Sequence, residues 1–125
     1  MSYQLALHPN PVYLHVKVTG ENTSDNIVNY IHEVGDICLE RKHSVVLIEE
    51  YLRGPGLSMF DIAKVFKVLR DTPRELHWVV YVDTNPAHDP IMMDFARELA
   101  IRRGLKVRLC CSVNEAKEWI EMMVK

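Results

Sequence analysis

The stretch VVLIEEYLRGPGLSMFDIAKVF, residues 45–66, decides the fold of this chain. An apolar run ends in Glu49 and Glu50, and a Gly-Pro-Gly loop then leads into an amphipathic segment that begins at Ser58. A continuous apolar run is typical of a parallel strand buried on both faces. Ser58 followed three residues later by Asp61 resembles a capping box, which marks the start of a helix. The stretch therefore predicts a buried strand, a tight loop and a helix, an arrangement in which α/β proteins often bind ligands and partners.

Strands and helices alternate on both sides of this junction. The strands are expected at Tyr3–Leu7, Val12–Val18, Val45–Ile48, Trp78–Val82 and Leu105–Leu109, the last of them at a sheet edge. Helices are expected to start at Thr23 or Ser24, at Ser58, at Asp89-Pro90 and at Ser112, where capping residues precede helical periodicity. The order ββαβαβαβα predicts one α/β domain over residues 1–125. We expect a mixed, mostly parallel sheet of about five strands with four helices packed on it.

The first half of the chain carries three further expectations. Val12, Leu14, Val16 and Val18 alternate with polar residues, so Tyr13 and His15 are predicted on the exposed face of a half-buried strand. If that strand lies near a sheet edge, this face is a candidate interface. In the first helix the buried stripe is predicted to be Ile27, Ile31, Val34 and Cys38, with Gly35 allowing a close approach to the sheet.

Composition and charge narrow the functional classes. With 15 basic and 17 acidic residues, the chain has no excess of positive charge to drive nucleic-acid binding. Its apolar runs are shorter than the roughly 20 residues of a membrane span, and no signal-peptide layout opens the chain, so we expect a cytoplasmic protein. Cys38, Cys110 and Cys111 lack metal-site or disulfide spacing and are expected to lie in or near the core, the adjacent pair facing opposite sides.

The strand end LIEEYL, the loop RGPGL and Ser58 resemble the STAS domain, the anti-sigma factor antagonist fold, and the likeness extends over nearly the whole chain. The segments VVYVDTNP and KVRLCCSVNEAKEWI look like that family's closing strand-helix-strand-helix. Small bacterial STAS-like proteins, related in fold to CRAL-TRIO lipid-transfer domains, give the best local match. The resemblance implies a regulatory module that acts by contact with a protein partner. The CRAL-TRIO relationship implies the alternative, small-molecule or lipid binding.

One departure from the family bears on regulation. Phosphorylatable antagonists typically have Asp-Ser-Ser-Gly at this junction, where this chain has Gly56, Leu57, Ser58 and Met59. We therefore expect Ser58 to act as a helix cap, with phosphorylation as the alternative. A phosphate there would face the negative charges of Asp61, Glu49 and Glu50.

Two candidate sites follow. The first is a partner-contact surface formed by Arg53, Gly54, Pro55, Gly56, Leu57 and Ser58. The second is a ligand cluster at the carboxyl ends of two neighbouring strands, made of Glu49, Glu50, Asp83, Asn85 and His88, although a turn role also explains Asp83 and Asn85. We expect no enzyme activity, cofactor or metal, because no nucleophile–base pair and no third metal ligand with suitable spacing can be named. A protein partner is expected, and a homodimer is one possible form of it.

Overall fold

The computed structural model describes residues 3–55, 57–69, 78–84, 90–102, 104 and 106–123. Its elements are β1 (Tyr3–His8), β2 (Leu14–Glu21), α1 (Ser24–Arg41), β3 (Val45–Arg53), α2 (Met59–Leu69), β4 (Trp78–Asp83), α3 (Pro90–Arg102), β5 (Val107–Leu109) and α4 (Val113–Met123). The predicted order ββαβαβαβα is confirmed, with four helices and a five-stranded sheet in the described residues.

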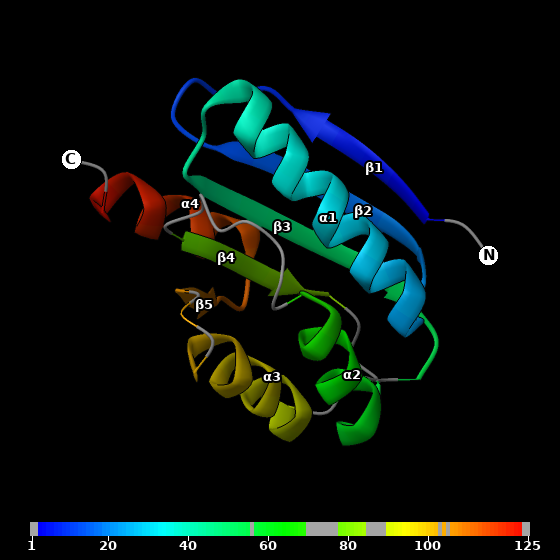
Figure 1. Cartoon of the computed structure of the whole chain (residues 1–125). Coiled ribbons are helices and arrows are strands. Elements are labelled where there is room, and N and C mark those ends of the chain that lie inside the picture. The colour runs from blue at the N-terminus through cyan, green and yellow to red at the C-terminus, as the bar shows by residue number, and fades with distance from the viewer. Residues whose placement is uncertain are drawn as a thin grey trace.

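The sheet follows the order of the chain, β1-β2-β3-β4-β5. β1 pairs antiparallel to β2, and the other neighbours are parallel, as predicted for a mixed, mostly parallel sheet. Figure 1 shows α1, α2 and α3 on one face of the sheet and α4 on the other. Right-handed crossovers between successive parallel strands place their helices on the same face, which explains this layering. β5 lies at an edge, as its alternating pattern predicts.

A hydrophobic core lies on each face of the sheet. On the α1 face, buried side chains of β2 and β3 pack against buried side chains of α1. The strand residues are Leu14, Val16, Val18, Val46, Ile48 and Leu52, and the helix residues are Tyr30, Val34 and Cys38. On the α4 face the buried residues are Tyr13, Val45, Leu47, Val80, Val82, Cys110, Ala116 and Ile120. Because both faces are covered, most side chains of the central strands are apolar, and the acidic ones on β3, Glu49 and Glu50, are buried.

This double cover corrects the expectation for β2. Tyr13 and His15 were predicted to be exposed, but their exposed fractions are 3% and 7%. β2 lies between β1 and β3, and Tyr13 belongs to the core on the α4 face. The alternation of apolar and polar residues along β2 therefore reflects two faces that are both buried, one of them more polar than the other. Because Tyr13 and His15 are buried, the interface suggested at these two residues is excluded.

α1 also differs in detail from its prediction. Thr23 is the N-cap, and its hydroxyl accepts a hydrogen bond from the Asn26 amide at 3.1 Å. The buried positions are Asn26, Tyr30, Val34 and Cys38, whereas Ile27 and Ile31 are only partly buried against the same core. A Cβ placed on Gly35 meets no atom within 4 Å, so the close approach to the sheet expected there does not exist.

The three cysteines differ in burial. Cys38 and Cys110 are buried and Cys111 is exposed, so the adjacent pair does face opposite sides. Burial raises the pKa of the Cys38 thiol to about 11, which keeps it protonated and unreactive at neutral pH. The expectation of a core position is wrong for Cys111 alone.

Candidate functional site

The loop after β3 is tied to the turn that precedes α1. The Asn22 amide donates to the Arg53 carbonyl at 2.7 Å, and Asn22 Nδ2 donates to the Pro55 carbonyl at 2.9 Å. Gly54 has φ +107°, a conformation that favours glycine, and this lets the chain turn away from the strand. Arg53, Gly54 and Pro55 are exposed. The loop is therefore presented to solvent but held in place at its start.

Ser58 caps α2, as predicted. Its Oγ accepts a hydrogen bond from the Asp61 amide at 3.1 Å and donates one to Asp61 Oδ2 at 3.0 Å. The predicted inward positions Ile62 and Val65 are buried. Leu57 is partly buried, whereas Ser58 is exposed, and the two residues that follow it carry large exposed apolar side chains. Met59 and Phe60 have exposed fractions of 52% and 81%.

Glu50 is buried beneath α1. The Tyr30 hydroxyl donates to Glu50 Oε2 at 2.5 Å, and Tyr81 also forms a side-chain hydrogen bond with Glu50. Burial, followed by the neighbouring Glu50 carboxyl group, raises the pKa values of both tyrosines well above their ordinary value. Both hydroxyls therefore stay protonated and can serve as donors. The strand places a carboxyl group in the core, and two tyrosines supply its partners.

Glu49 lies on the opposite face of the sheet. His15 Nε2 is 2.9 Å from Glu49 Oε2, and the Tyr51 hydroxyl donates to Glu49 Oε1 at 3.2 Å. The pKa of His15 is lowered because burial of the ring outweighs its hydrogen bond to Glu49. The ring of His8 lies 4.7 Å from that of His15, between centroids. This second polar group lies across β1, β2 and β3 on the α4 face of the sheet, with Lys117 of α4 close enough to act on His15.

The predicted ligand cluster is therefore divided. Glu50 and Asp83 are register partners on β3 and β4, and Thr84 donates from its amide and its hydroxyl to the Glu50 carbonyl. Glu49 cannot join them, because successive strand residues point to opposite faces. β3 continues to Arg53, so both acids lie inside the strand rather than at its end. Asn85 and His88 are outside the described residues, as is Gly56 of the predicted contact surface.

A crystal structure with the same fold was found among solved proteins. It is an uncharacterised protein of the DUF3478 family from Shewanella loihica, described as having a SpoIIAA-like fold. The two chains align with a TM-score of 0.57 and 16% identity, over 95% of this chain and 94% of the other. The fold is STAS-like. No protein-family model and no curated protein matches the chain.

Ser58 immediately precedes α2 at the carboxyl edge of the parallel strands, and Figure 1 shows that edge, where β3 leads into α2. Its hydroxyl is already engaged with Asp61. Ser58 therefore serves as the N-cap of α2.

Several residues that shape this region were missed by sequence reasoning. They are Asn22, which anchors the loop, Tyr30 and Tyr81, which bind Glu50, and His15, which contacts Glu49. The signal available was the pair of acids inside an apolar strand, since buried carboxyl groups require hydrogen-bond partners. The sequence alone did not show which residues those partners would be.

The described residues contain neither a metal-binding cluster nor a membrane-spanning helix. No group of three or more His, Cys, Asp or Glu side chains in that part of the chain is arranged to hold a metal ion. Among the described helices, none has both the length and the apolar character required to cross a bilayer.

Proposed function

We propose that this chain is a non-catalytic, STAS-like regulatory module that acts by direct contact with a protein partner. The contact surface comprises the loop Arg53 to Ser58 and the first turn of α2. The observation that carries this proposal is the exposure of Met59 and Phe60, whose apolar side chains stand next to the anchored loop. Adjacent exposed apolar side chains on a folded domain typically mark an interaction surface.

A second helix adds to this surface. α3 begins at the same edge of the sheet as α2, because each follows the carboxyl end of a parallel strand. Ile91, in the first turn of α3, has an exposed fraction of 71% and so occupies a position similar to that of Phe60 in α2. We expect the partner to offer an apolar recess to Phe60, with polar contacts to the loop.

A contact function is favoured over catalysis by the state of the acidic groups. Glu49 and Glu50 are buried, and each is engaged by hydroxyl or imidazole groups. Neither of them lines the pocket between α1 and α2. The chemistry available to them is structural hydrogen bonding.

Regulation of this contact is proposed to work without phosphorylation of Ser58. A phosphate on Ser58 would replace the hydroxyl hydrogen that Ser58 donates to Asp61 Oδ2, and it would lie beside the Asp61 carboxylate. The alternative of lipid binding has less support. The pocket between α1 and α2 measures about 230 Å³, and four of its six lining residues are polar.

The test compares two equivalent substitutions on opposite faces. Phe60→Asp removes the central apolar side chain of the proposed surface. Met122→Asp is the matched control, because Met122 is 74% exposed and lies on α4, across the sheet. Tagged wild type and both variants are used to recover partners from native lysate, after their unfolding midpoints are shown to agree. The proposal predicts a partner retained by wild type and Met122→Asp but lost with Phe60→Asp, and identical partner lists contradict it.

A further inference from the structure

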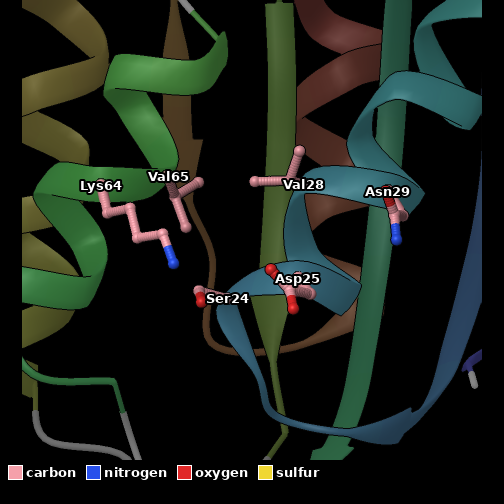
Figure 2. Close-up of a pocket in the computed structure, with 6 residues that line it drawn as sticks. All are labelled: Ser24, Asp25, Val28, Asn29, Lys64 and Val65. Carbon is pink, nitrogen blue, oxygen red and sulfur yellow. The ribbon is translucent and has the colours of Figure 1, made fainter. Parts of the chain in front are cut away.

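A pocket separate from the contact surface lies between the first turns of α1 and the middle of α2 (Figure 2). Its volume is about 230 Å³, and its lining residues are Ser24, Asp25, Val28 and Asn29 from α1 with Lys64 and Val65 from α2. Figure 2 shows the Val65 and Val28 side chains on facing helices, Ser24 and Asp25 below them in the view, and Lys64 beside Val65 with its amine end directed toward Ser24. The site thus combines an apolar part with a charged part.

The size of the pocket limits its ligand. The pocket is about half open to solvent, and its volume of about 230 Å³ is room for several water molecules. Sites for drug-sized ligands are larger, about 300 to 1,000 Å³. A metabolite of about ten non-hydrogen atoms therefore matches the pocket better than a lipid chain or a nucleotide.

The charges of the pocket select among small metabolites. Lys64 contributes a cation from α2 and Asp25 an anion from α1, and no ion pair between these two described residues links the helices. A ligand that carries only negative charge is repelled by Asp25, and one that carries only positive charge is repelled by Lys64. A ligand with both charges satisfies both residues. The hydroxyl of Ser24 and the amide of Asn29 add uncharged hydrogen-bonding groups.

We infer that this pocket binds a small zwitterion of the amino-acid class. The ligand's carboxylate pairs with Lys64 and the Ser24 hydroxyl, its ammonium group pairs with Asp25, and a short apolar side chain lies against Val28 and Val65. This site is independent of the protein contact proposed above, since none of its six residues belongs to that surface. Because both charged side chains are exposed to solvent, each ion pair contributes modestly, and a dissociation constant near the millimolar range is expected.

The test is an NMR titration of the ¹⁵N-labelled chain with single amino acids as probes, from glycine to leucine. Acetate, inorganic phosphate and butylamine are titrated in parallel as ligands with one kind of charge. The expected result is saturable shifts of the Ser24, Asp25, Val28 and Val65 amides with at least one amino acid below about 10 mM, and at least fivefold weaker binding of the singly charged compounds.

Three variants complete the test. Lys64→Met and Asp25→Asn each remove one charge and are expected to weaken amino-acid binding at least fivefold. Lys67→Met is the matched control, because Lys67 is an exposed lysine on the same helix that does not line the pocket, and it should bind like wild type. The inference is overturned if no amino acid gives saturable shifts at these amides, if acetate or phosphate binds equally well, or if Lys67→Met weakens binding as much as Lys64→Met.

Discussion

The hydrogen bond between Tyr30 and Glu50 should be a major contributor to the stability of the fold. Tyr30 is 1% exposed and Glu50 is 2% exposed, and their oxygens are 2.5 Å apart. Tyr30→Phe removes the hydroxyl and leaves the ring in place. The change therefore deletes one hydrogen bond to a buried carboxyl group with little change in packing.

The expected loss follows from that environment. A hydrogen bond contributes about 0.5 to 3 kcal/mol, with the upper part of the range for bonds to a charged group, and loss of a partner is more costly when the remaining group is buried. Glu50 keeps its bond to Tyr81, so it is not left without a partner. We expect Tyr30→Phe to lower the free energy of unfolding by about 2 kcal/mol, a large part of the 5 to 15 kcal/mol typical of a domain.

The measurement is urea unfolding followed by circular dichroism at neutral pH. Tyr51→Phe is the matched control, since Tyr51 donates to Glu49 at 3.2 Å on the other face of the sheet and is only partly buried. We expect Tyr51→Phe to lower the free energy of unfolding by less than about 1 kcal/mol. Equal losses for the two variants, or a loss below about 0.5 kcal/mol for Tyr30→Phe, would refute the reasoning.

Three further predictions address other parts of the fold. Burial lowers the pKa of His15 in the folded chain, so its contribution to stability should be full above the pKa of the unfolded chain, about 6.5, and should fall as pH drops below that value. Between about pH 7.5 and 5.5, the free energy of unfolding should therefore decrease more for wild type than for His15→Gln. Parallel curves for the two proteins would contradict this prediction. Gly35→Ala should stabilise the chain by about 0.5 to 1 kcal/mol, because a Cβ at that position has open space. Gly54→Ala should destabilise the chain by about 1 to 2 kcal/mol, because the φ angle of Gly54 is +107°. A higher melting temperature for Gly54→Ala than for Gly35→Ala would contradict the backbone conformations described for these two glycines. Ser58→Ala should cost about 1 kcal/mol through loss of the cap, and protein purified from its native cell should carry no stoichiometric phosphate on Ser58 by mass spectrometry.

The order of the elements was predictable because each element has its own local signal. Ser58 with Asp61 predicts the start of α2, and Pro90 stands at the first position of α3. The apolar run from Val45 predicts a strand buried on both faces. These signals depend on backbone preference and capping, which act over a few residues.

The arrangement of the acidic residues at the candidate site was not predictable, because it depends on contacts between segments that are distant in the chain. Glu49 and Glu50 are adjacent, and whether they form one cluster depended on how far β3 extends. β3 continues to Arg53, so the two carboxyl groups separate onto opposite faces and find partners 34 and 20 residues away. His15 was predicted to be exposed for a similar reason, since its burial follows from the neighbouring strands and α4.

The central claim is that the chain contacts a partner through the first turn of α2, and photo-crosslinking inside the native cell tests it most directly. A photoreactive benzoyl-phenylalanine is placed at Phe60 and, separately, at Met122, two apolar positions of similar exposure on opposite faces of the sheet. The account predicts a discrete protein adduct from position 60 that is absent from position 122. No adduct at position 60, or the same adducts from both positions, would contradict it.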